Sequence, residues 1–340
     1  MAESWFDLNR ADQAEALEVA AGRLGRPAHL LEKDVWVVWA LSAIYGAAFA
    51  DKLTFKGGTS LSKVYKIIDR FSEDIDLTYD IRELVPDLLR DGNPLPASSS
   101  QQKKISGAVR ERLSNWIQDA VKPVLEAALQ RDSLQAALRL EGKDKEKLVL
   151  AYSPVKTGTG YAAATILLEF GARATGEPHQ THTVICDMAN SIEGIEFPVA
   201  WPLVMTAERT FWEKATAAHV YCLQGRLRGE RYSRHWVDLA AMATSGHAAR
   251  AAHDRDLAKA VAAHKSVFFS EKDATGSLID YFQAVSGLIQ IVPQGSALSA
   301  LEKDYAAMLE DGLLSAGAPD FSEVMRNCQL IQRQLNQRAI

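Results

Sequence analysis

Residues 53–77, LTFKGGTSLSKVYKIIDRFSEDIDL, constrain the fold of this chain more than any other segment. A short strand pattern ends where Gly57 and Gly58 interrupt it. Apolar residues then follow at helical spacing over residues 59–69, and residues 74–79 alternate as in a second strand. The segment therefore predicts a strand, a Gly-Gly turn, a helix and a second strand in direct succession.

Two carboxylates lie on the second of these strands. Asp74 and Asp76 are two positions apart, so both side chains project from one face, whereas Ile75 and Leu77 point to the other face. Carboxylates held this close repel each other unless a cation lies between them. Mg²⁺ or Mn²⁺, which take carboxylate and phosphate oxygens, are the natural candidates.

The Gly-Gly turn suits an anion. Gly57 and Gly58 allow the backbone to approach a ligand without a Cβ in the way, and Thr59 and Ser60 follow at the start of the helix. The free N–H groups and the dipole of a helix N-terminus favour an anion such as a triphosphate. The spacing thus predicts a phosphate site next to a pair of metal-binding carboxylates.

Helical patterns flank this segment. Apolar spacing predicts helices over residues 10–24 and 27–47, a Pro- and Ser-rich loop over 91–102, and a helical pattern from residue 207 onward. The predicted fold class is α+β, with a small mixed β-sheet, N-terminal helices and a helical C-terminal lobe. We expect two domains, residues 1–200 and 201–340.

The composition excludes several classes of protein. The chain is 47% hydrophobic and 24% charged, which is ordinary for a globular protein and unlike a disordered or collagen-like chain. Three cysteines argue against a disulfide framework and for a reducing compartment. Neither a signal-peptide pattern nor a transmembrane run is visible, so the expected localisation is cytoplasmic, without a membrane partner. The net charge of −5 means that any nucleic acid must be bound by a local basic patch.

The order and spacing of the glycine and carboxylate motif match the metal-binding core of the nucleotidyltransferase fold. The chain resembles the AbiEii/AbiGii group of nucleotidyltransferase toxins over about residues 25–245. The resemblance is most specific from the GGTS run at Gly57 through the RFSEDIDL run that contains Asp74 and Asp76. The segment Glu32-Lys33-Asp34 is also similar to the family.

Two later segments add to the resemblance. In AERTFWEK, Lys214 matches a helix-borne lysine that the family uses in nucleotide handling, and in RYSRHWVDL, Asp238 matches the family's acid. Arg234 and His235 stand where the family usually has a Lys-Asp pair. Lys214 lies among apolar residues, so a buried amine there needs an acid or a phosphate as its partner, and Asp238 or a triphosphate would supply it.

The resemblance also implies a third metal ligand on a neighbouring strand. Glu169 lies in ILLEFG and Asp187 in TVICDM, and both fit the pattern of apolar residues followed by an acid. A carboxylate in an apolar strand requires a partner. We prefer Glu169, and Asp187 stays open as the alternative.

The resemblance implies an enzyme, a Mg²⁺- or Mn²⁺-dependent nucleotidyltransferase that moves NMP from an NTP to an acceptor hydroxyl. The implied acceptor is RNA, with tRNA 3′ ends favoured, and the implied partner is a cognate antitoxin in a toxin–antitoxin or abortive-infection system. Transfer onto a protein or small-molecule hydroxyl and a degenerate nucleotide-binding regulator are the alternatives. The implied catalytic residues are Asp74, Asp76, Lys214 and Asp238, the nucleotide-binding residues Gly57, Gly58, Thr59, Ser60 and Lys214, and the metal ligands Asp74, Asp76 and Glu169.

An arginine cluster follows the segment that carries Lys214. It consists of Arg226, Arg228, Arg231 and Arg234. A solvated interhelical loop is the simpler interpretation of such a run. Next to a nucleotide site, contact with RNA phosphates is the alternative hypothesis.

Overall fold

The computed structural model describes residues 2–70, 72, 74–157, 163–225, 232–310, 313–314 and 317–337. The chain divides into two units. The first, here called the sheet unit, comprises Met1–Val64, Ser72–Pro94 and Lys104–Met205. The second, the helical unit, comprises Tyr65–Phe71, Leu95–Lys103 and Thr206–Ile340.

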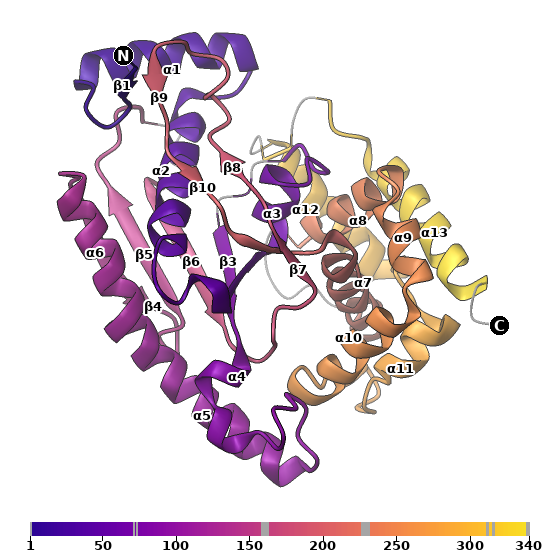
Figure 1. Cartoon of the computed structure of the whole chain (residues 1–340). Coiled ribbons are helices and arrows are strands. Elements are labelled where there is room, and N and C mark those ends of the chain that lie inside the picture. Colours follow the sequence, from indigo (N-terminus) through magenta and orange to yellow (C-terminus); the bar gives the residue numbers. More distant parts are fainter. Residues whose placement is uncertain are drawn as a thin grey trace. The chain divides into compact units, whose positions relative to one another are not determined.

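A seven-stranded mixed sheet organises the sheet unit, with the strand order β4-β5-β6-β3-β2-β11-β7 (Figure 1). β3 pairs in parallel with β6, and β11 pairs in parallel with β2, whereas the other neighbours are antiparallel. Two small two-stranded ladders, β1–β9 and β8–β10, complete the strands. The strands of the large sheet are β2 (Leu53–Lys56), β3 (Asp74–Tyr79), β4 (Ala136–Glu141), β5 (Lys147–Tyr152), β6 (Thr165–Gly171), β7 (His179–Thr181) and β11 (Leu203–Met205). The short ones are β1 (Glu3–Ser4), β8 (Val184–Ile185), β9 (Ile195–Glu196) and β10 (Val199–Ala200).

Local signals in the sequence explain the first helices. Asn9 accepts hydrogen bonds from the N–H groups of Ala11 and Asp12 at the start of α1, and Gly25 ends that helix in the left-handed conformation. α2 begins after Pro27, and most of its side chains are buried as it packs against β6, β10 and α6. α2 is therefore a core helix of the sheet unit. The helices of this part of the chain are α1 (Arg10–Leu24), α2 (Ala28–Tyr45), α3 (Gly57–Lys63), α4 (Ile81–Leu84), α5 (Ser99–Trp116) and α6 (Lys122–Arg131).

The predicted α+β class is confirmed, and several boundaries differ from the sequence expectation. The helix expected to reach residue 69 ends at Lys63, because the chain takes a positive φ of 53° at Lys66 and continues into the helical unit. The loop expected over 91–102 already becomes helical at Ser99, where α5 begins.

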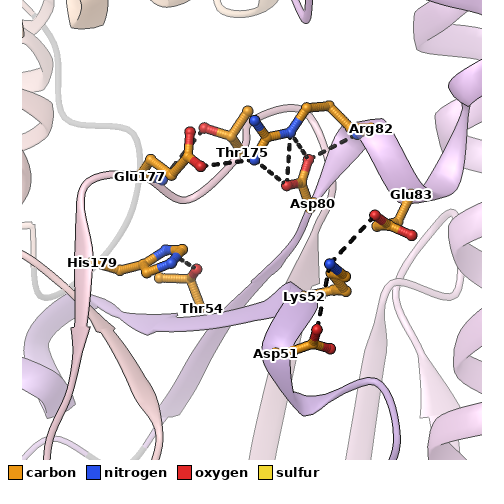
Figure 2. A network of polar contacts seen from close by, with 9 residues as sticks. All are labelled: Asp51, Lys52, Thr54, Asp80, Arg82, Glu83, Thr175, Glu177 and His179. Atoms are coloured by element: carbon orange, nitrogen blue, oxygen red, sulfur yellow. Dashed lines mark hydrogen bonds and ion pairs between the residues drawn. The ribbon is translucent and has the colours of Figure 1, made fainter. Parts of the chain in front are cut away.

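A polar network holds the end of β3 that lies farthest from Asp74 (Figure 2). Asp80 caps α4 through the Arg82 N–H, and the Arg82 side chain bridges Asp80 and Glu177 at 2.6 and 2.8 Å. Thr54 on β2 lies 3.1 Å from Nδ1 of His179 on β7. These contacts therefore tie Glu177, after β6, to α4, and His179 on β7 to β2.

The helical unit is built around α7, which contacts α8, α9 and α10. Thr206 caps the start of α7, and Gly225 ends it at a φ of +66°. Trp212 and Trp236 are fully buried, and each indole N–H donates to a backbone carbonyl. No helix in the described ranges combines the length and hydrophobicity that crossing a bilayer requires. The helices are α7 (Ala207–Gln224), α8 (Arg234–Thr244), α9 (His247–His253), α10 (Arg255–Phe268), α11 (Tyr281–Gln283), α12 (Gly295–Glu310) and α13 (Phe321–Gln337).

Candidate functional site

The two glycines expected to form a turn before the helix are instead the first two residues of α3, which follows β2 directly, and Gly57 lies against one of the β3 carboxylates. Gly57 has a φ of +80°, and a Cβ built on it would come 2.0 Å from Asp76 Oδ2. Only glycine adopts this conformation and leaves this space at low cost. The sequence therefore places glycine where the backbone turn and the carboxylate meet.

The hydroxyl groups that follow the turn are used to hold the backbone. Thr59, which is 1% exposed, donates through Oγ1 to the carbonyl of Asp74 and lies 2.9 Å from Ser72 Oγ. Ser60 Oγ donates to the Gly57 carbonyl at 2.9 Å. These two side chains fix the entry to β3 and the turn itself, so the groups they would offer a phosphate are their backbone N–H groups.

Carboxylates gather on one face of the sheet. Asp74 and Asp76 are half-buried on β3, whereas Ile75 and Leu77 on the other face are buried. Glu169 on β6 lies directly opposite Asp76 in the parallel ladder. Residues opposite each other in adjacent strands point to the same face, so Glu169 shares the face of Asp74 and Asp76.

Glu169 already has a cationic partner. Lys147, at the start of β5, lies opposite Glu169 in the antiparallel ladder, and its ammonium group donates to the Glu169 carboxylate. Among the residues that the structure describes, no group of three His, Cys, Asp or Glu side chains is arranged to hold a metal ion. The oxygen donors on this face fit Mg²⁺ or Mn²⁺ in kind, but Lys147 engages the third of them.

Asp187, the alternative third ligand, belongs to a different cluster. Its carboxylate lies 2.8 Å from the Lys63 ammonium group and 2.5 Å from Arg26, and Lys63 also contacts Asp34 at 2.6 Å. Burial alone would lower the pKa of Lys63, but the charges of Asp34 and Asp187 raise it, so Lys63 stays protonated. Asp187 is therefore a counterion for Lys63 on α3. Of the two candidates for the third metal ligand, Glu169 is the one that lies opposite Asp76.

The segment Glu32-Lys33-Asp34 is buried on α2, although all its side chains are charged. Glu32 accepts hydrogen bonds from the N–H groups of Val155 and Lys156 at 2.7 and 2.9 Å. The Lys33 ammonium group donates to the carbonyl of Ala163 at 3.0 Å. Asp34 accepts from the N–H of Asp187 at 2.6 Å, in addition to pairing with Lys63.

A second charged group lies in the helical unit. Asp238 on α8 is fully buried, and its carboxylate binds Arg70 at 2.7 and 2.8 Å and the Lys214 ammonium group at 2.9 Å. Burial alone would raise the pKa of Asp238, but the charges of Arg70 and Lys214 hold it well below its usual range. Asp238 is thus the acid partner that the apolar surroundings of Lys214 require.

His235 lies one turn before Asp238 and carries no charge at neutral pH. Burial, followed by the charge of Lys214, lowers the pKa of His235 well below its usual value. Its Nδ1 atom is buried and has no hydrogen-bond partner within the described part of the chain. Of the arginine cluster, Arg234 begins α8, whereas Arg226, Arg228 and Arg231 lie outside the described residues.

Sequence reasoning did not select three cations that the structure brings to these groups. They are Lys147 at Glu169, Lys63 at Asp34 and Asp187, and Arg70 at Asp238. Arg70 stands in the RFSEDIDL run, so its presence in the motif was visible, although its partner was not.

Most of the chain matches a family of known proteins. The family model described as "Nucleotidyl transferase AbiEii toxin, Type IV TA system" matches residues 39–327. Among solved structures, the chain is similar to MenT4, a nucleotidyltransferase toxin from Mycobacterium tuberculosis H37Rv. The sequences are 14% identical and the TM-score is 0.48, over 96% of this chain and 89% of MenT4. No curated protein matches the sequence.

Proposed function

Because this chain belongs to the AbiEii family of nucleotidyltransferase toxins of type IV toxin–antitoxin systems, we propose that it transfers NMP from an NTP to an RNA hydroxyl. The family makes the chain an enzyme and implies an antitoxin partner. The observation that carries the proposal is the Asp76 carboxylate against the Gly57 turn, with Glu169 opposite it. A metal-bound triphosphate requires a carboxylate for the metal and backbone N–H groups for the phosphates side by side.

Each site residue of the sheet unit has a role in this proposal. Asp74 and Asp76, with Glu169, would hold a divalent cation, which when bound supplies positive charge that neutralises the phosphates. The missing Cβ of Gly57 leaves room for the Asp76 carboxylate beside the start of α3, where the backbone N–H groups of Gly57 and Gly58 would bind the triphosphate. Thr59 holds the start of β3 against α3 through its bond to the Asp74 carbonyl. The acceptor hydroxyl oxygen forms a bond to the α-phosphorus and gives up its proton to solvent. The bond between the α-phosphorus and the oxygen that bridges to the β-phosphorus breaks, and pyrophosphate leaves with that electron pair.

Lys214 is proposed to neutralise phosphate charge. The Lys214 side chain is 11% exposed, and its ammonium group is held by Asp238, whose carboxylate also binds Arg70. A lysine held in one position offers a charge that needs no reorganisation when the phosphoryl group transfers. Asp238 and Arg70 therefore act as positioning residues for Lys214.

The acceptor is proposed to be RNA, with tRNA 3′ ends favoured. The support comes from the family and from the arginine cluster that follows α7 in the sequence. The intact pair Asp74 and Asp76 favours an active enzyme over a degenerate nucleotide-binding regulator, because cation binding is the best reason to keep both acids.

The test is to incubate the purified protein with Mg²⁺, each α-³²P-labelled NTP and total tRNA. We expect label on tRNA from the wild-type protein and none with a chelator or with Asp76→Asn. Asp119→Asn, which removes an exposed acid from the π-helical segment Ile117–Val121 between α5 and α6, is the matched control and should retain transfer. Label on protein or on a small molecule instead would support a different acceptor, and full transfer by Asp76→Asn would reject the carboxylate assignment.

The same assay tests Lys214. We expect Lys214→Met to lower kcat/KM by about a hundredfold, as the loss of one transition-state charge does. Asp238 keeps its two bonds to Arg70 in this variant, so the fold should persist. A changed melting temperature with unchanged turnover would instead make Lys214 a structural residue.

A further inference from the structure

One lysine lies among the carboxylates that we propose as metal ligands. Lys147 faces Glu169 across the β5–β6 ladder, and Asp76 faces Glu169 across the β6–β3 ladder. Glu169 therefore has a cation on one side and a second carboxylate on the other. The register of three adjacent strands fixes this order.

The charge of Lys147 acts on this whole face. The pKa of Lys147 is raised, chiefly by its hydrogen bond to Glu169 and further by the charges of Glu169, Glu146 and Asp74. Lys147 thus does part of what a bound cation would do.

The pair is also easy to separate. The side chains of Lys147 and Glu169 are 35% and 34% exposed, and a half-exposed ion pair of this kind contributes little net stability. An ammonium group and a divalent cation repel each other, so both cannot bind the same carboxylate at full strength.

We propose that Lys147 is a built-in competitor of the divalent cation: it binds Glu169 in the cation-free protein and releases it when Glu169 joins Asp74 and Asp76 as the third ligand. This inference rests on the proposed function, since it takes those carboxylates as the metal ligands. Because the pair must separate before Glu169 can bind the cation, Lys147 lowers the affinity of the site for the cation.

The experiment measures Mn²⁺ affinity from the paramagnetic resonance signal of free Mn²⁺, without any substrate. We expect Lys147→Met to bind Mn²⁺ about tenfold more tightly than the wild type, because the competing charge and its pair are gone. Lys143→Met removes a charge from an exposed position near β5 and is the matched control, expected to bind as the wild type does. Lys147→Gln, which keeps a hydrogen-bond donor for Glu169 without the charge, should show an intermediate gain and serves if Lys147→Met does not fold.

The competition itself is tested in a Glu169→Gln background. There the gain from Lys147→Met should shrink to about threefold, because no carboxylate remains to be released and only the loss of a nearby charge is left. An equal gain in both backgrounds, or affinities of the wild type and Lys147→Met within twofold, would overturn the inference while the metal site stands. The absence of Mn²⁺ binding in every variant would overturn the inference and the metal assignment of the proposed function together.

Discussion

At the scale of the residue, the requirement for glycine at position 57 comes from the neighbouring Asp76 carboxylate. Because a Cβ there would come 2.0 Å from Asp76 Oδ2, we expect Gly57→Ala to displace this carboxylate and to abolish nucleotide transfer. The positive φ adds a backbone cost of about 1 kcal/mol. The measurements are transfer activity and the free energy of unfolding in urea.

Gly25 supplies the control for this substitution. Its φ is also positive, at +63°, but no atom lies within 4 Å of the position that a Cβ would take. Gly25→Ala should therefore lose only the backbone cost of about 1 kcal/mol and keep its transfer activity. Loss of transfer by both variants would attribute the effect to backbone strain alone, and retention by both would remove Gly57 from the site.

The ion pairs of Asp238 predict how the free energy of unfolding depends on pH. The pKa of Asp238 in the folded protein lies below its value in the unfolded chain, which is about 4. The ion pairs of Asp238 therefore contribute their full stability above about pH 4, and this contribution is lost as the pH falls below that value. At pH 7, Asp238→Asn leaves Arg70 and Lys214 buried without their acid and should cost about 3–5 kcal/mol of unfolding free energy. Urea denaturation at pH 7 and pH 3 checks both points: the difference between wild type and variant should be smaller at pH 3. A difference that stays constant would mean that Asp238 is not ionised in the folded protein.

The candidate site could be predicted from the sequence only where its residues are close together along the chain. The Asp74-Ile75-Asp76 run predicted that both carboxylates lie on one face of a strand, and the GGTS run predicted the phosphate site beside them. The cations could not be assigned in this way, because Lys147 and Glu169 are separated by 22 positions and Arg70 and Asp238 by 168. Only strand pairing and helix packing decide which of the many lysines and arginines meets each acid.

At the scale of the element, α2 acts as a polar anchor inside an apolar core. Its consecutive residues Glu32, Lys33 and Asp34 each bind a different part of the chain: residues 155–156, the carbonyl of Ala163, and Asp187 with Lys63. Buried charges of this kind are tolerated only when all of them have partners. α2 therefore fixes α3, which carries the Gly-Gly turn, and both ends of the connection between β5 and β6.

This role predicts a local effect of Glu32→Ala. The N–H groups of Val155 and Lys156 would lose a charged acceptor, and such a bond contributes about 1.5–3 kcal/mol. We expect hydrogen exchange at these two amides to accelerate by about tenfold or more, while the amides of α2 itself stay protected. Glu18→Ala, which removes an exposed acid that pairs with the Lys156 side chain, is the control and should leave this exchange unchanged. Unchanged exchange in Glu32→Ala would show that the anchor does not hold this segment.

Elements differ in how far local sequence determines them. α1 has a side-chain cap at Asn9 and a glycine stop at Gly25, and its predicted and observed bounds coincide. α3 carries apolar helical spacing beyond Lys63, but the chain leaves the helix there, takes a positive φ at Lys66 and belongs to the helical unit from Tyr65 on. β11, which is three residues long, was not predicted, because only its pairing with β2 and β7 defines it as a strand.

At the scale of the whole molecule, net charge opposes the proposed acceptor. The chain carries a net charge of −5, so a polyanionic RNA is repelled on average and must be held by a local basic surface. The arginine cluster is the candidate for that surface. Each phosphate that an arginine contacts releases counterions, so the logarithm of RNA affinity falls with the logarithm of salt at a slope set by the number of contacts.

We therefore expect the double variant Arg226→Ser/Arg228→Ser to weaken tRNA binding and to flatten this slope by about one or two units. NTP binding should change less, because its phosphates are proposed to lie at the Gly57 turn. The control is Arg131→Ser/Arg139→Ser, which changes the net charge equally at exposed arginines that pair with Asp132 and Glu141. If the overall field governed binding, both double variants would weaken it alike, whereas a local site predicts a changed slope only for the first. Equal slopes for the first variant and the wild type would remove the arginine cluster from the acceptor site and favour a protein or small-molecule acceptor.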